Sequence, residues 1–328
     1  MNRPCDFCMK PKTSPCAYKS SITNQLVKVY LCEECMEREK KFISKIVIKG
    51  EQECTQNITK AMKLVSTVKL QRAKERAERS KNYFTSIYDT VSSILAKSSN
   101  IDHKFLRESE SKKKAVILLT GNRGLAGGYN SNVIKLLTKS GNFEKDDTIV
   151  YAVGKKGRDA FKRLGYEIRE DYSEVIEEPL YKDAMEISER VLADFEAGEI
   201  GEIYLAYTFF KNTVSHVPTL LKLLPVDMEA TKPERDEEKA EVSVPMNFEP
   251  SDEEALDMII PKYMTSLIFG ALVEAVASEN GARMQAMDSA TNNATEIIDN
   301  LSLLYNRARQ SSITQELTEI IAGADAIS

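Results

Sequence analysis

The sequence predicts an α/β protein in which a Rossmann-like α/β domain is combined with a long antiparallel coiled coil of N- and C-terminal helices. Two long stretches near the two ends show the apolar spacing of amphipathic helices, and the residues between them alternate between short strands and helices. All six cysteines lie within the first 54 residues. This clustering predicts an additional small, zinc-knuckle-like segment at the N-terminus.

Composition narrows the classes of function. The 328-residue chain has room for two domains, and its 42% hydrophobic residues are enough for a core. A net charge of −5 argues against a general nucleic-acid binder. No run of apolar residues is long enough to span a membrane, and the opening MNRPCDFC lacks the apolar core of a secretory signal. We therefore expect a cytosolic chain, free or docked on a membrane complex.

Residues 1–45 form a predicted zinc-binding segment. Two CxxC pairs are separated by 23 residues: Cys5 and Cys8, then Cys32 and Cys35. Four thiolates at this spacing can surround one tetrahedral zinc ion, and the metal would supply folding energy that the few apolar residues here cannot. Reduced cysteines in a disordered leader and a redox CxxC pair are the alternatives. A catalytic zinc is disfavoured, because four cysteines close the site and the only histidines are His103 and His216.

Residues 46–100 are predicted to form the first coiled-coil helix. Neither Gly nor Pro interrupts the sequence between Gly50 and Gly121. Within this helix, the basic stretch Lys69–Lys81 is predicted to be either a solvated face or a surface for acidic loops of a partner. Apolar residues recur at steps of three and four, as on an amphipathic helix: Ile58, Met62, Val65 and Val68, then Phe84, Ile87, Tyr88, Val91, Ile94 and Leu95.

Residues 112–228 are predicted to form the α/β domain. Short apolar runs alternate with helical stretches, which implies layers of helices around a mostly parallel sheet. A helix is expected at Asp183–Glu196. The predicted strands are Lys114–Thr120, Thr148–Val153, Ile203–Phe210 and Ser215–Leu224.

A glycine-rich turn, GNRGLAGGYN, follows the first of these strands and invites a nucleotide-binding interpretation. The spacing of its glycines matches neither GxGxxG nor GxxxxGK[ST], and the second strand ends in Gly154 and Lys155 rather than in an acidic ribose partner. A tight structural turn is favoured. No hydrolase triad is indicated either, and His216 is expected to be a surface strand residue. The glycines in question are Gly121, Gly124, Gly127 and Gly128.

An acidic, proline-containing linker or hairpin is predicted at residues 229–255, and the second coiled-coil helix at residues 256–328. No proline occurs from Lys262 to Ile321, a stretch that would be about 90 Å long as one helix. The polar stretch Asp288–Thr295 exceeds what a plain coiled coil needs, so its side chains are expected to meet a second partner. The predicted seam comprises Ala286, Ala290, Ala294, Ile297, Leu301, Leu304, Ile313, Leu317 and Ile320.

Two segments carry a family resemblance. Thr55–Leu70 (TQNITKAMKLVSTVKL) and Val276–Gly323, with its GARMQAM and RARQSSIT motifs, resemble the terminal helices of the gamma subunit of F-type ATP synthases. The glycine turn is similar to the DRGLCGGxN turn of the same family. The resemblance runs from Thr55 to the end, about five-sixths of the chain. It implies a central-stalk rotor that couples ion transport to ATP synthesis and has no active site and no bound nucleotide of its own.

The resemblance also implies partners. The coiled coil would turn inside a hexamer of three alpha and three beta subunits, and the α/β domain would contact the epsilon subunit and the c-subunit ring, with one copy per complex. The chain would be a peripheral protein on the cytoplasmic side of a bacterial cell membrane. The residues implied as partner contacts are Met62, near an acidic lever loop of a beta subunit, Arg283, and the catch-loop contacts Arg309, Gln310 and Thr314.

The first 54 residues depart from this family, whose members begin with a short basic stretch directly before the ITKAM motif. A folded segment of about 45 residues has an expected radius of about 9 Å, which is hard to fit beside a coiled coil in a closed bearing. The segment is therefore routed outward, alters assembly, or comes from an aberrant fusion or gene model, and we favour the last of these explanations. The alternative functions are a zinc-binding adaptor with helical interaction surfaces and a nucleotide-using α/β enzyme.

Overall fold

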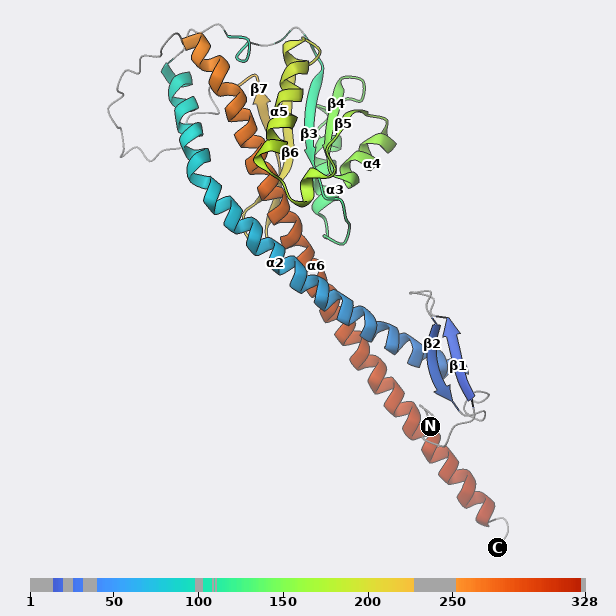
Figure 1. The fold of residues 1–328 in the computed structure, drawn as a ribbon. Helices are drawn as coiled ribbons and strands as arrows, with labels where there is room; N and C mark the ends of the chain where they lie inside the picture. Colours follow the sequence, from blue (N-terminus) through green and yellow to red (C-terminus); the bar gives the residue numbers. More distant parts are fainter. Residues whose placement is uncertain are drawn as a thin grey trace. The chain divides into compact units, whose positions relative to one another are not determined.

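The computed structural model describes the backbone of residues 14–19, 26–31, 40–97, 103–107, 109, 111–226 and 252–325. The chain divides into two compact units. One unit comprises Met1–Lys63 and Met287–Ser328, and the other comprises Leu64–Ala286. Figure 1 shows the elements of both units along the chain.

The Leu64–Ala286 unit contains a five-stranded sheet in the order β5-β4-β3-β6-β7. Four strands are parallel, and β7 pairs antiparallel with β6 at one edge. This arrangement confirms the predicted mostly parallel α/β layer. The strand β5 was not predicted, because its sequence EIRED is charged and it lies at the other edge of the sheet. The strands are β3 (Lys114–Leu119), β4 (Thr148–Val153), β5 (Glu167–Asp171), β6 (Glu202–Phe210) and β7 (His216–Leu224).

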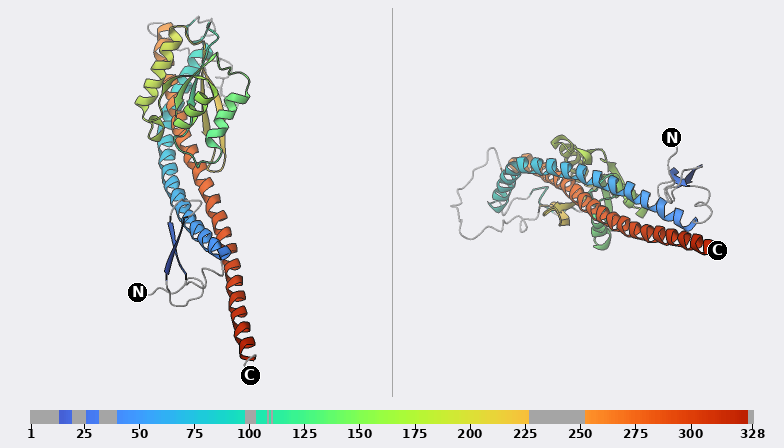
Figure 2. Two further views of the ribbon diagram at one scale, coloured as in Figure 1. Left: turned by 90° about the vertical axis from the view of Figure 1, so that its right-hand side faces the viewer. Right: turned by 90° about the horizontal axis from the view of Figure 1, so that it is seen from below.

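Helices cover both faces of this sheet (Figure 2). Successive side chains of a strand point to opposite faces. Val116 and Leu118 of β3 therefore pack with α3 (Tyr129–Lys139) and α4 (Lys155–Leu164) on one face. On the other face, Ile117 and Leu119 pack with α5 (Tyr181–Glu196) and the first part of α6. A short 3-10 helix, η1 (Val175–Glu177), lies before α5 in the chain.

Two long helices run through both units: α2 (Lys40–Lys97) and α6 (Asp252–Asp325). Gly50 lies inside α2, and Pro261 lies inside the first turns of α6. Within the Leu64–Ala286 unit, Leu70 and Ala73 of α2 pack against Ala277 of α6. Among the described residues, α6 is the helix that is long enough and apolar enough by composition to cross a membrane. However, 56% of its apolar window is buried inside the protein, as in the core helix of a soluble domain.

The other unit begins with an antiparallel hairpin of β1 (Ser14–Lys19) and β2 (Leu26–Leu31). Ser14 is opposite Leu31 in this pairing, so the chain enters β1 and leaves β2 at the same end of the hairpin. The four predicted zinc ligands lie outside the described residues, as does most of the predicted 229–255 linker.

Candidate partner-binding surfaces

The carboxyl ends of β3 and β6 are the place where a nucleotide would be expected. The strand order reverses between these two strands, and open α/β sheets bind ligands at such a switch point. In this protein α6 contacts that place instead. A Cβ added at Gly121, directly after β3, would lie 2.7 Å from Glu279 Oε1 of α6. The chain's own helix therefore fills the position that a ligand would take.

His216 was expected to be a surface strand residue; it does begin strand β7, but its side chain is half-buried rather than fully exposed. Its ring lies against Gly281 of α6, where an added Cβ would be 2.7 Å from His216 Cε1. The ring also lies 5.9 Å from that of Phe210, and burial lowers the pKa of the imidazole. The approach of a helix to the β6–β7 turn, which strand pattern alone cannot indicate, accounts for the burial.

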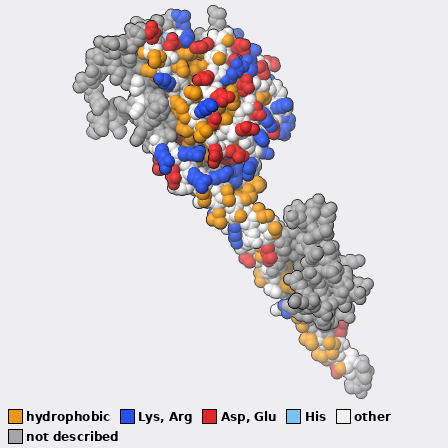
Figure 3. Space-filling view, viewed as in Figure 1, with side chains coloured by type: hydrophobic (Ala, Val, Ile, Leu, Met, Phe, Trp, Pro, Cys, Tyr) orange, Lys and Arg blue, Asp and Glu red, His pale blue; other side chains and the backbone are white. Residues whose placement is uncertain are grey.

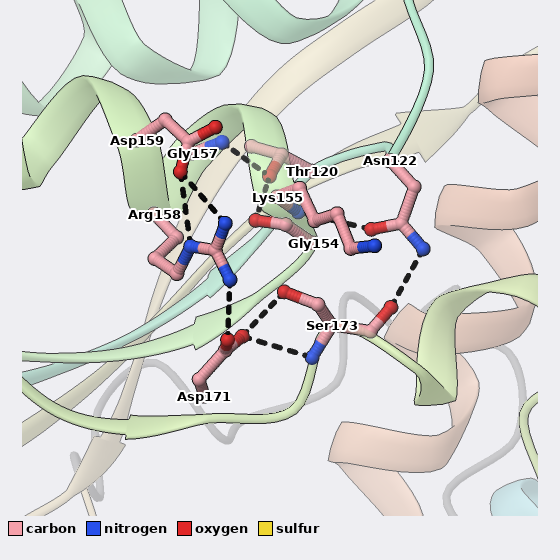
Figure 4. Close-up of polar contacts among 9 residues, drawn as sticks. All are labelled: Thr120, Asn122, Gly154, Lys155, Gly157, Arg158, Asp159, Asp171 and Ser173. Atoms are coloured by element: carbon pink, nitrogen blue, oxygen red, sulfur yellow. Dashed lines mark hydrogen bonds and ion pairs between the residues drawn. The ribbon is translucent and has the colours of Figure 1, made fainter.

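The N-terminus of α4 is a second place where a phosphate could bind, since free helix amides attract anions. Figure 4 shows that the chain occupies these amides itself. The Lys155 amide donates to Asn122 Oδ1 at 2.9 Å, and the Gly157 amide donates to Thr120 Oγ1 at 2.9 Å. The Asn122 side chain in turn donates to the Ser173 carbonyl at 2.7 Å. The turn after β3 is thus a structural tie between β3, α4 and the segment after β5.

An ion pair reinforces this tie. Arg158 of α4 donates to Asp171 Oδ2 at the end of β5, at 2.6 Å. Burial would raise the pKa of Asp171, but hydrogen bonds from Ser173 and Arg158 outweigh it and lower the pKa. The cluster therefore holds strands and a helix together and leaves no open nucleophile or base.

The apolar stripe of α2 is exposed, not buried. An amphipathic helix usually turns such a stripe toward its own core, yet Ile58, Val65 and Val68 are each more than half exposed. Apolar side chains gather on this part of α2, beside a band of basic side chains (Figure 3). The residues of α2 that are buried instead are Thr59, Ser66, Leu70 and Ala73.

Polar side chains join α2 to α6 in the unit that contains both chain ends. Thr59 and Thr291 are both buried. The expectation that the polar stretch Asp288–Thr295 faces a second partner is therefore wrong for three of its residues, which contact α2. The matching spacing of three and four in both helices was the signal for this ladder. Its contacts are Gln56 Nε2 to Thr295 Oγ1 at 2.6 Å, Thr59 Oγ1 to Thr291 Oγ1 at 2.7 Å, and Lys63 Nζ to Asp288 Oδ1 at 2.5 Å.

The seam predicted on α6 holds only in part. Ala294 is 3% exposed, as a small seam residue should be. Farther along the helix Ile313, Leu317 and Ile320 are 46%, 55% and 69% exposed. A row of large apolar side chains in water is unfavourable unless another surface covers it. The end of α6 therefore has the properties of a binding surface.

The structure separates the residues implied as partner contacts into different environments. Arg309 and Gln310 are exposed on α6, and Thr314, also exposed, donates its hydroxyl to the Gln310 carbonyl at 2.9 Å one turn later. Met62 is half-buried on α2. Arg283 has only 12% of its side chain exposed and pairs with Glu279 on its own helix.

The basic stretch of α2 borders a groove in the Leu64–Ala286 unit. Lys69, Arg72 and Arg76 line it together with Val273 and Val276 of α6, and Glu177 and Glu178 also lie in its lining. Its lining combines apolar side chains with charges of both signs, so it does not by itself indicate the charge of a partner. Within the described part of the chain, no group of three or more His, Cys, Asp or Glu residues could hold a metal ion.

The family model described as ATP synthase matches residues 50–327. The ATP synthase gamma chain of Lachnoclostridium phytofermentans is 65% identical over 275 residues, which are 83% of this chain and 94% of that relative. The gamma chain of Acetobacterium woodii, described as sodium ion specific, is 41% identical over 285 residues, which are 83% of this chain and 94% of that relative.

Two solved structures share the fold. The rotor of the Euglena gracilis mitochondrial ATP synthase superposes with a TM-score of 0.57 at 18% identity, covering 83% of this chain and 98% of that one. The central stalk and c-ring of the Tetrahymena thermophila mitochondrial ATP synthase gives a TM-score of 0.51 at 24% identity, covering 71% and 99%. The similarity at these low identities concerns the fold alone.

Proposed function

Because this chain belongs to the family of ATP synthase gamma chains, we propose that it is the central-stalk rotor of an ATP synthase. In this role it couples ion flow through the membrane sector to ATP synthesis or hydrolysis on the beta subunits. The relatives are named as gamma chains, so a zinc-binding adaptor and a nucleotide-using enzyme, the two alternatives, have no support among them.

The observation that carries the proposal is that polar side chains lie between the two helices while large apolar side chains lie exposed on them. The described contacts between α2 and α6 near the chain ends are polar, while large apolar residues such as Val65 and Leu317 remain exposed. Such a surface is stable only when a partner covers it. A surrounding ring of subunits supplies that cover, and the exposed side chains differ around each helix. Each orientation of the rotor therefore favours a different state of each surrounding subunit by differential contact.

We assign the partners accordingly. Three alpha and three beta subunits surround α2 and the end of α6, with Met62, Arg309, Gln310 and Thr314 in the contact. The α/β domain meets the epsilon subunit and the c-subunit ring, with one copy of the chain per complex. This arrangement makes the chain a peripheral protein on the cytoplasmic side of the cell membrane. Arg283 is also proposed as a partner contact on the family resemblance alone, since only 12% of its side chain is exposed.

Reconstitution tests this proposal. The full chain is mixed with the alpha and beta subunits of the same organism, and the assembly is measured by native mass spectrometry and by ATP hydrolysis. We expect one copy of the chain per three alpha and three beta subunits, together with stimulated hydrolysis. The Val65→Asp variant should weaken assembly at least about tenfold, because it buries an unpaired charge. The Asn142→Asp variant adds the same charge at an exposed position of the α/β domain, away from the helices that meet alpha and beta, and should assemble normally. Failure of the wild-type chain to assemble would refute the role.

We also propose that Cys5, Cys8, Cys32 and Cys35 bind one structural zinc ion, with residues 1–45 as a separate segment. The support is the CxxC spacing together with chain order: the first pair precedes β1, the second follows β2, and the chain enters β1 and leaves β2 at the same end of the hairpin. Zinc content of the purified chain tests this: one zinc per chain is expected, and none in the Cys32→Ser/Cys35→Ser variant. A wild-type chain without zinc would contradict the proposal.

The segment must first be present in the native subunit. Intact mass of the subunit from the native complex decides this point. A mass near 36.9 kDa means that the complete chain rides on the rotor. A mass several kilodaltons lower means that the native subunit starts with an ordinary gamma-chain helix and that residues 1–54 have no role in the rotor.

A further inference from the structure

The α/β domain contacts residues Ser278 to Arg283 of α6 from two opposite sides, an arrangement called the grip below. Successive residues of an α-helix are turned by about 100°, so Glu279 and Gly281 project about 200° apart, on nearly opposite sides. The turn after β3 contacts the side of Glu279, and the β6–β7 turn contacts the side of Gly281. This pair of opposed contacts is a geometry that resists rotation of the helix about its own axis.

The first side of the grip is a buried ion pair. Glu279 is 8% exposed and pairs with Arg283 one turn later on α6. Tyr129, at the start of α3, is buried beside this pair. Burial raises the pKa of its phenol well above the usual range, and the charge of Glu279 adds to the effect while that of Arg283 opposes it. Gly121 makes room for the carboxylate, because any Cβ there would collide with Glu279 Oε1.

The second side of the grip is a close approach of backbone and ring. Gly281 lies against the imidazole of His216, and the ring of Phe210 lies beside it. Ser278, on the same side of α6, donates its hydroxyl to the Thr208 carbonyl of β6 at 3.0 Å in a buried position. The α6 backbone can approach the β6–β7 turn this closely because position 281 has no side chain.

We propose that this arrangement, the α6 socket, is the element that transmits torque between the α/β domain and α6. The α6 socket comprises Gly121, Tyr129 and His216 of the domain and Ser278–Arg283 of the helix. In it the helix takes the place of the ligand of a nucleotide-binding fold. Glu279, Gly281 and His216 are positioning residues: they fix the angle of α6 without touching a substrate. This inference rests on the proposed rotor function and assigns the torque to particular contacts.

A double-mutant cycle between Gly281 and His216 tests the proposal in the complete membrane complex. Gly281→Ala adds one methyl group that collides with the ring, while Gly281→Ala/His216→Ala removes the ring and makes room for it. Gly124→Ala is the matched control, because it adds the same methyl group in the turn after β3 at a position with no atom within 4 Å of the added Cβ and no positive φ. Hydrogen exchange of the amides of residues 278–283 and the number of ions pumped per ATP hydrolysed are measured for each variant.

We expect Gly281→Ala to raise the exchange rate of these amides by about 5- to 150-fold, the range that corresponds to typical overpacking costs. Ions pumped per ATP should fall, while ATP hydrolysis continues. The double variant and Gly124→Ala should both behave as wild type. Equal loss in the single and double variants, or an unchanged Gly281→Ala variant, would overturn the α6 socket. A wild-type chain that does not assemble would instead refute the rotor function itself.

Discussion

The α/β domain and the helix pair at the chain ends use apolar side chains in opposite ways. In the domain, Ile117, Leu118 and Leu119 are completely buried, and helices cover both faces of the sheet. In the helix pair, threonines are buried while Leu317 and Ile320 are exposed. The domain supplies its own hydrophobic stabilisation, whereas the helix pair leaves much of its apolar surface for another molecule. Stability and partner binding are therefore separated along the chain.

The largest expected effect contrasts one leucine from each region. Leu118→Ala should lower the free energy of unfolding of the domain by about 3 kcal/mol, because it leaves a cavity in a closed core. Leu317→Ala makes the same chemical change on exposed α6 and should change the stability of the free chain by less than about 0.5 kcal/mol. Chemical denaturation of both variants measures the difference. Equal losses would show that the end of α6 has a core of its own.

The next largest effect is the pH dependence of the free energy of unfolding that the carboxyl group of Glu274 causes. Burial raises its pKa to about 7 from 4.5, and its Oε2 atom is buried without a hydrogen-bond partner. A raised carboxyl pKa means that stability is complete below pH 4.5 and is lost as pH rises through 7. After allowance for partial exposure the loss is about 2 kcal/mol. Glu274→Gln should therefore be more stable than wild type at pH 8 and equal at pH 4.5. Parallel stability curves across this range would contradict the assignment.

The third effect, a destabilisation of about 1 kcal/mol, concerns the buried hydrogen bond between Thr59 and Thr291. Thr59→Val removes a hydrogen bond of the polar ladder and should destabilise the pairing of α2 with α6 by that amount. Thr59→Val/Thr291→Val replaces both hydroxyls by methyl groups of similar size and should recover most of the loss. Hydrogen exchange of residues 50–63 reports the pairing. A double variant weaker than the single one would mean that the polar contact is essential to the helix pair.

The smallest expected effect concerns Lys63 and Asp288. Both side chains are more than 40% exposed, so their ion pair should contribute no more than about 0.5 kcal/mol. Asp288→Asn should lower the protection of the pairing slightly in low salt and not at all in about 1 M salt, where charges a few ångströms apart are screened. An effect that survives high salt would point to a hydrogen bond rather than to charge.

The sequence predicted the layered fold because long apolar runs such as Thr148–Val153 leave few alternatives, and that strand is found with the expected bounds. It did not predict β5, whose charged residues suit an edge position that only the complete sheet defines. The α6 socket was also beyond sequence reasoning. Gly281 looks like an ordinary helix glycine until the β6–β7 turn is placed against it.

The spacing of apolar residues located the two long helices, but it did not indicate which side of each helix faces the other. The stripe of Ile58, Val65 and Val68 has the spacing of a buried seam, yet it is exposed. The reason is that polar residues at the same period on both helices satisfy one another, and this pairing depends on a register that a single helix sequence does not contain. The roles of Met62, Arg309, Gln310 and Thr314 remain proposals that the partner experiments address.

Oxidative footprinting of the apolar side chains tests the central claim most directly. Hydroxyl radicals label exposed leucine and isoleucine side chains, and labelling is compared between the free chain and the chain assembled with alpha and beta subunits. We predict that Ile313, Leu317 and Ile320 are labelled in the free chain and strongly protected in the complex, while Leu118 is unlabelled in both. Equal labelling of the three α6 residues in the two states would contradict the account, because the exposed apolar surface would then have no partner.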